Sequence, residues 1–109
     1  MVWDFVDDFV AAGYDAYEGI QASAGMDMKK LKERVGNKLT LWGGVTNENL
    51  ILGKPDDVRK DALYAIKWGA PGGGFIYGAS HSLAVGTKLQ NLLAMKESRE
   101  KWGKYPISA

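Results

Sequence analysis

The chain has no cysteine and a single histidine, His81, among its 109 residues. Without cysteine there are no disulfide bonds, no thiolate nucleophile and no cysteine-ligated metal. Long hydrophobic runs are missing as well: none approaches the ~20 residues of a membrane-spanning helix. The residues that follow Met1 also lack the basic region of a signal peptide. We therefore expect a soluble, cytoplasmic protein with no membrane partner.

An excess of charge of one sign is also missing, because 14 lysines and arginines face 13 acidic residues for a formal net charge of +1. A protein that binds nucleic acid through its surface normally carries a basic excess, so we expect no nucleic-acid partner. The 46% hydrophobic and 25% charged residues are typical of a globular domain. A chain of this length has room for one modest core, so we treat residues 1–109 as a single domain.

The sequence does contain a regular alternation of helical and strand patterns. Hydrophobic periodicity and end signals predict helices at residues 2–12, 28–35, 55–69 and 87–102, a helical turn at 46–52, and strands at 14–18, 39–42 and 75–77. Because a helix follows each strand, we expect right-handed crossovers, parallel strands and helices on one face. A parallel sheet is normally covered on both faces. Two alternatives are therefore open. The chain is either a small three-layer domain, or part of a closed barrel in which further strands would cover the inner face of the sheet.

The last predicted helix has both a start signal and an apolar side. Thr87 and Gln90 have the spacing of a capping box, in which each side chain pairs with backbone at the first turn. Gly103 is a natural stop. The side expected to be buried is formed by Leu89, Leu92, Leu93 and Met95.

The candidate site follows the third predicted strand. Three glycines at 72–74 mark a loop, and after the strand at 75–77 the residues become small and polar, with His81 on the way to the next helix. In parallel sheets, ligands and chemistry gather at the carboxyl ends of the strands. His81 is therefore the candidate catalytic residue. The alternative is a loop histidine that hydrogen-bonds to backbone.

The ends of the other two strands add further candidates. Gly43 and Gly44 follow the second strand, and such a glycine pair lets backbone come close to a ligand or to a neighbouring strand. Glu18 lies where the first strand is expected to end, so its carboxylate faces either a ligand or an ordinary hydrogen-bond donor.

A series of short motifs runs through nearly the whole chain. They lie at residues 12–15 (AGYD), 31–38 (LKERVGNK), 41–45 (LWGGV), 53–58 (GKPDDV), 73–76 (GGFI) and 80–82 (SHS). In this order and spacing they resemble the carboxyl-terminal part of a uroporphyrinogen decarboxylase family protein. The resemblance implies an α/β fold that is part of a (β/α)8 TIM barrel, with about three parallel strands and four helices.

The resemblance also implies a function, the decarboxylation of tetrapyrrole acetate side chains in porphyrin biosynthesis. A complete barrel needs ~250 residues, so the chain corresponds to the last three βα units. The first five carry the family's basic substrate contacts, its catalytic aspartate, and its tyrosine and serine. His81 matches the family's histidine, which helps to bind an acetate carboxylate or the reacting pyrrole. We add Ser80, Gly43 and Gly44 as substrate-binding residues, and we expect no metal or organic cofactor.

Two other functions are open. A second branch of the family consists of corrinoid-dependent methyltransferases, which bind zinc through a histidine and two cysteines. Their final cysteine falls where this chain has His81, but the other ligands would lie upstream of Met1, so we expect no metal site here. The third possibility is a non-catalytic assembly module. In each case we expect the isolated chain to be inactive, and to self-associate or to pair with the missing barrel portion.

Overall fold

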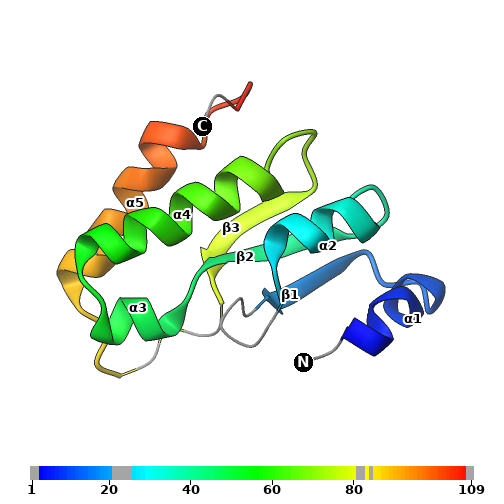
Figure 1. Cartoon of the computed structure of the whole chain (residues 1–109), viewed down its shortest axis with the longest axis horizontal. Coiled ribbons are helices and arrows are strands. Elements are labelled where there is room, and N and C mark those ends of the chain that lie inside the picture. The colour runs from blue at the N-terminus through cyan, green and yellow to red at the C-terminus, as the bar shows by residue number, and fades with distance from the viewer. Residues whose placement is uncertain (1–2, 21–25, 81–82, 84, 108–109) are drawn as a thin grey trace.

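The computed structural model describes residues 3–20, 26–80, 83 and 85–107. It contains one parallel sheet of three strands, arranged in the order β1-β2-β3 (Figure 1). The strands are β1 (Ala16–Ile20), β2 (Thr40–Val45) and β3 (Phe75–Ala79). The predicted α/β class, with three parallel strands side by side in chain order, is therefore confirmed.

Helices precede β1 and follow every strand. They are the 3-10 turn η1 (Trp3–Phe5) and the helices α1 (Val6–Ala11), α2 (Met28–Val35), α3 (Asn47–Leu52), α4 (Pro55–Gly69) and α5 (Leu89–Trp102). The first predicted helix is therefore η1 followed by α1, and α3 is the predicted helical turn. None of the described helices is both long enough and apolar enough to cross a membrane.

Local signals explain where α2 and α4 form. Asp27 caps α2, because its carboxylate accepts a hydrogen bond from the backbone N–H of Lys30 at 3.2 Å. Pro55 starts α4, where a missing N–H costs nothing. The apolar stripes of both helices are buried: Met28, Leu31 and Val35 in α2, and Val58, Ala62, Ala65 and Ile66 in α4.

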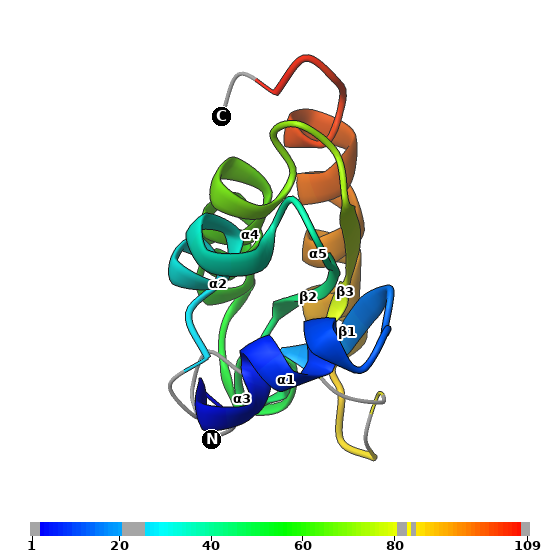
Figure 2. The same ribbon diagram turned by 90° about the vertical axis from the view of Figure 1, so that its right-hand side faces the viewer.

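The helices cover one face of the sheet. Side chains alternate along a strand, and in β2 Leu41 and Val45 are fully buried whereas Trp42 is 41% exposed on the other face. Ile76 of β3 is paired with Trp42 and is 42% exposed. Figure 2 shows α2 and α4 on one side of the strands. The described residues thus form two layers with a bare sheet face, which fits part of a barrel and not a three-layer domain.

Two clusters form the core on the covered face. One joins β1 and the start of β2 to α2, and it includes Leu31, Val35 and Leu41. The other joins the end of β2 to α3, α4 and α5 through Val45, Leu50, Val58, Ala62 and Ala94. Each cluster therefore ties a crossover helix to the sheet.

Several element boundaries differ from the prediction. β1 covers Ala16–Ile20 and not 14–18, because the backbone N–H of Tyr14 donates to the carbonyl of Phe9 at 3.2 Å and stays in the turn after α1. β2 and β3 continue beyond their predicted ends, since pairing with a neighbour outweighs the low strand propensity of glycine. The N-cap residue of α5 is Lys88, so the predicted capping box at Thr87 does not start the helix.

The predicted buried side of α5 is wrong for two of its four residues: Met95 packs against the second core cluster and Leu92 is half-buried, but Leu89 and Leu93 are exposed. The buried residues are Asn91, Ala94 and Ser98, whereas Leu89 and Leu93 are 70% and 47% exposed. The side-chain amide of Asn91 donates to three backbone carbonyl groups in and after α3. These hydrogen bonds fix the rotation of α5 about its axis and turn the two leucines outward.

Candidate functional site

The carboxyl ends of the three strands meet at one edge of the sheet, because the strands are parallel. At this edge, the backbone N–H of Ser80 donates to the carbonyl of Val45 at 2.8 Å and extends the pairing of β2 with β3. His81, the predicted catalytic residue, is next in the chain but lies outside the described residues. The structure therefore locates the strand end from which His81 departs, and it leaves the catalytic assignment as a prediction.

Ser80 joins the end of β3 to the start of α3. The residue is 2% exposed, and its Oγ accepts a hydrogen bond from the backbone N–H of Asn47, the first residue of α3, at 3.2 Å. The hydroxyl group thus has a structural partner. Its predicted contact with a substrate is not tested by this arrangement.

The glycine pair of β2 lies against the neighbouring strands. A Cβ atom on Gly43 would lie 3.1 Å from the Cβ of Ile20 in β1. A Cβ atom on Gly44 would lie only 2.8 Å from the carbonyl oxygen of Gly78 in β3, and Gly44 has a φ of +153°, which residues with side chains rarely adopt. The close backbone approach predicted for this pair is therefore to β1 and β3. An approach to a ligand as well is still a prediction.

The bare face of the sheet is organised in layers. Glu18, Trp42 and Ile76 are paired in register and form one layer, and Gly44 and Gly78 form the next layer toward the carboxyl ends. The Nε1 atom of Trp42 lies 3.1 Å from the position that a Cβ of Gly78 would occupy, so the indole leans over the glycine layer. Glu18 is in the middle of β1 and not at its end as predicted. In a closed barrel these side chains point inward.

Sequence reasoning missed the role of Asp61. This residue lies on α4, and its Oδ2 atom accepts hydrogen bonds from the backbone N–H of Thr46 at 3.1 Å, the hydroxyl of Thr46 at 2.9 Å and the amide of Asn49 at 2.8 Å. Thr46 is 8% exposed and is the N-cap residue of α3. Asp61 therefore fixes the segment that leaves β2. Its position on the inward side of α4, one residue before Ala62, was the available signal.

Asn91 fastens the other end of α3. Its Nδ2 donates to the carbonyl oxygens of Asn49 at 3.1 Å, Leu50 at 3.2 Å and Gly53 at 2.8 Å. Its Oδ1 is buried and has no hydrogen-bond partner within the part of the chain that the structure describes. Asp61 and Asn91 together hold α3 at both ends, so the carboxyl edge of the sheet has a rigid support between β2 and α4.

The pKa values of three tyrosines on the helical side, Tyr17, Tyr64 and Tyr77, are raised, the last two most strongly. Burial raises the pKa of Tyr77, whose hydroxyl donates to the carbonyl of Met95 at 2.7 Å. The hydrogen bond from Tyr64 to the carboxylate of Asp27 raises the pKa of that phenol to about 12. Both phenols therefore keep their protons near neutral pH, and neither is available as a base at the carboxyl edge.

Within residues 3–20, 26–80, 83 and 85–107, no three side chains of histidine, cysteine, aspartate or glutamate come together in a way that could hold a metal ion. The only histidine of the chain lies outside these ranges. The absence of a metal site is therefore still a prediction for the protein as a whole.

Comparison with known proteins agrees with this geometry. Residues 3–102 match the family model described as uroporphyrinogen decarboxylase (URO-D). That span begins with η1 and ends with α5, so it includes every described helix and strand. No curated protein gives a significant match to the chain. The chain belongs to the uroporphyrinogen decarboxylase family, and its three parallel strands are part of that family's (β/α)8 barrel.

Proposed function

We propose that the chain supplies the last three βα units of a uroporphyrinogen decarboxylase-like enzyme and is inactive without the other units. The complete enzyme removes carbon dioxide from acetate side chains of a tetrapyrrole, a reaction of porphyrin and haem biosynthesis. Two observations support this proposal: the family match over residues 3–102, and the sheet whose strands all end at one edge.

The bare face of the sheet is the observation that most strongly supports this proposal. In a barrel of eight parallel strands, the outer face is covered by helices and the inner face is closed by the strands across the barrel. Trp42 and Ile76 are 41% and 42% exposed on the bare face, beside the exposed Glu18. Among the described residues, β1 and β3 are each paired on one side only. Five further strands would cover this face and would pair with the free edges of β1 and β3.

In the complete barrel, we assign His81 to the reacting acetate group. Decarboxylation breaks the bond between the methylene carbon and the carboxylate, carbon dioxide leaves, and a proton takes its place on the methylene carbon. As the family resemblance implies, His81 would follow the last strand of the barrel and bind the carboxylate or the reacting pyrrole. Ser80, Gly43 and Gly44 would form the adjoining wall, where backbone groups lie close to the barrel mouth.

The test compares the chain alone with a reconstituted barrel. The purified chain should convert no uroporphyrinogen. Addition of a polypeptide that carries the first five βα units of a family decarboxylase should give a complex with measurable turnover. In that complex, His81→Ala should lower kcat by about a hundredfold or more. Lys60→Gln on the exposed surface of α4 is the control and should leave kcat unchanged.

Each other outcome counts against a stated part of the proposal. Turnover by the isolated chain contradicts its inactivity. Failure of the two polypeptides to co-purify contradicts the completion of the barrel. A co-purified complex without product contradicts the decarboxylase assignment, and a complex that is equally active with His81→Ala contradicts the role of His81.

A non-catalytic assembly module is the second candidate, and the exposed apolar surface favours it. Ile76 on the bare sheet face and Leu89 and Leu93 on α5 are 42%, 70% and 47% exposed. Exposed strand edges and apolar patches promote association. In this case the bare face is buried against a second copy of the chain, whether or not any reaction follows.

Light scattering measures that association. The isolated chain should have a mass well above the 11.9 kDa of one copy, and Ile76→Lys should shift it toward the monomer because a charge on the bare face opposes burial. Leu52→Lys is the control: Leu52 is 80% exposed on α3, away from the bare face, so the mass should not change. A monodisperse wild-type monomer would count against both the module and an unpaired piece of barrel.

A further inference from the structure

The bare face of the sheet changes in character toward the carboxyl ends of its strands. Side chains project from its middle layer, where Glu18, Trp42 and Ile76 are exposed and paired in register. Beyond this layer each strand has a glycine within two residues, and these glycines are Gly19 in β1, Gly44 in β2 and Gly78 in β3. Glycine has no side chain, so backbone alone forms the sheet surface at those positions.

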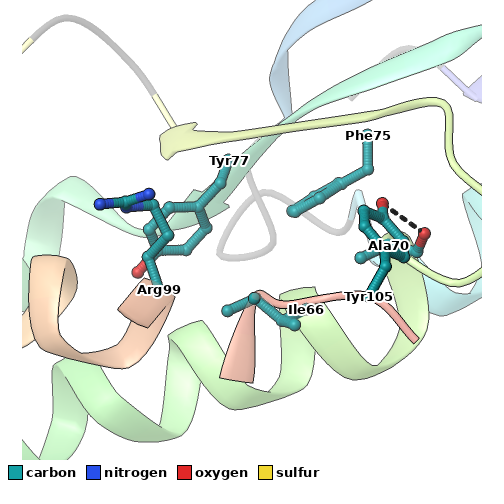
Figure 3. A pocket seen from close by; sticks show the side chains of 7 residues that line it. Ile66, Ala70, Phe75, Tyr77, Arg99 and Tyr105 are labelled. Atoms are coloured by element: carbon teal, nitrogen blue, oxygen red, sulfur yellow. Dashed lines mark hydrogen bonds between the residues drawn. The ribbon is translucent and has the colours of Figure 1, made fainter. Parts of the chain in front are cut away.

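The residues that end the three strands face the helices. Ile20 belongs to the first core cluster, Val45 belongs to the second, and Ala79 packs against the second. Figure 3 shows the same direction for Phe75 and Tyr77, whose side chains extend from β3 toward α4. Between the middle layer and the strand ends, the described strands therefore place no side chain on the bare face.

The indole of Trp42 lies beside the glycine of β3. Its Nε1 and Cδ1 atoms are 3.1 and 3.5 Å from the position that a Cβ of Gly78 would occupy. Unlike Gly44, Gly78 has no positive φ, so its backbone conformation does not require glycine. The close approach of the indole is the reason that glycine fits here, because a methyl group would push the ring aside. Trp42 is 41% exposed, so the ring still presents surface on the bare face.

The inside of a complete (β/α)8 barrel is normally filled by layers of bulky side chains. In a barrel completed as proposed above, these three strands would contribute no side chain to the layer nearest the mouth. Their inner wall there is a recess, with Trp42 and Ile76 as its floor and the backbone of Gly44 and Gly78 as its side. The recess opens at the carboxyl edge, where Ser80 follows β3 and where ligands enter such barrels.

We propose that Trp42 forms the floor of the substrate site and makes it specific for a flat ring. This inference rests on the proposed decarboxylase function. One pyrrole ring of the tetrapyrrole lies against the indole, in the space left by Gly44 and Gly78, with its acetate group toward the carboxyl edge. Two flat aromatic rings pack favourably, and strand glycines let a ligand approach the backbone closely. The exposed carboxylate of Glu18 in the same layer repels the acetate from the floor, so it favours this orientation.

The binding of uroporphyrin to the completed barrel, followed by fluorescence titration, tests this contact without any turnover. The complex of the chain with the first five βα units should bind uroporphyrin with a Kd between about 1 μM and 1 mM, the range of KM values common among enzymes. Trp42→Leu, which keeps an apolar side chain without the flat ring, should weaken binding by at least about fivefold, and Trp42→Phe should restore most of the affinity. Gly78→Ala keeps the whole floor but places a methyl group 3.1 Å from the indole, so it should also weaken binding. Trp68→Leu on α4 is the matched control and should leave the Kd unchanged.

The inference is overturned if Trp42→Leu binds uroporphyrin as tightly as the wild-type complex does, or if Trp42→Phe is as weak as Trp42→Leu. An unchanged Kd for Gly78→Ala contradicts the recess. The inference is also overturned if Trp68→Leu weakens binding as much as Trp42→Leu does. The ligand would then bind outside the barrel, where the ammonium groups of Lys29 and Lys67 lie 4.5 and 5.3 Å from the centroid of the Trp68 ring. Trp42-dependent binding without turnover contradicts the decarboxylase assignment alone, and polypeptides that do not co-purify contradict both proposals.

Discussion

Asn91→Asp should lower the free energy of unfolding by at least about 4 kcal/mol near neutral pH. The Nδ2 atom of Asn91 donates to three carbonyl oxygens at 3.1, 3.2 and 2.8 Å, and the side chain is fully buried. The substitution removes both N–H donors of the amide, which serve the three carbonyl oxygens, and buries a carboxylate among carbonyl dipoles that repel it. Urea denaturation followed by circular dichroism measures the loss.

The loss from Asn91→Asp should also depend on pH. Burial and the facing carbonyl groups raise the pKa of the introduced carboxyl in the folded state above its unfolded value of ~3.9. Below that unfolded value both states are protonated, so the difference from wild type is smallest. The difference grows as the pH rises toward the folded pKa, because the unfolded state then releases its proton first. Wild type and variant should therefore be compared near pH ~4 and near pH ~7.5.

Asn37→Asp is the matched control, because Asn37 is exposed and the same chemical change there should cost less than about 0.5 kcal/mol. A loss at Asn91 that is the same at both pH values would contradict the burial of a charge. A loss as small as that of the control would contradict the three hydrogen bonds.

Gly44→Ala should cost at least about 3 kcal/mol, the second large effect. The added Cβ would lie 2.8 Å from the backbone carbonyl oxygen of Gly78, an atom that strand pairing holds in place. The backbone of Gly44 also has a φ of +153°, which alanine disfavours. Relief of the contact requires β2 and β3 to separate at the carboxyl edge. Denaturant unfolding should show a lower midpoint with an unchanged slope.

Gly13→Ala separates the two causes. Gly13 has a φ of +91°, but an added methyl group there would have nothing within 4 Å, so only the backbone cost of about 1 kcal/mol applies. A Gly44→Ala variant as stable as Gly13→Ala would show that β2 and β3 are not in contact at this point.

Local sequence was sufficient for α2 and α4. Both have a start signal, Asp27 in one and Pro55 in the other, and an apolar stripe within a few turns, and both helices lie at the predicted residues 28–35 and 55–69. The sequence predicted which segments form strands but not where the strands end. Pairing with β3 extends β2 through its glycines, and this pairing is not visible in the local sequence. In α5 the hydrophobic pattern was misleading for Leu89 and Leu93. One buried amide, that of Asn91, decides the rotation through bonds to residues about forty positions earlier in the chain.

The candidate site was only partly predictable. A lone histidine after a strand pointed to the carboxyl end of β3, and the described strands do end together at that edge. Asp61 was missed, because an aspartate within a helix has no local mark that its hydrogen-bond partners lie in another segment. The partners of Asp61 lie fifteen and twelve residues away, at Thr46 and Asn49.

By itself, the sequence determined the types and order of the elements, the parallel crossovers and the membership in a family of barrels. These follow from periodicities and end signals that act within one or two turns, and from motifs along the chain. Only the tertiary structure decided which face of the sheet is bare, which side of α5 is buried and what Ser80, Gly43 and Gly44 contact. Those outcomes depend on hydrogen bonds and close approaches between distant segments, whose energies exist only after the chain has brought them together.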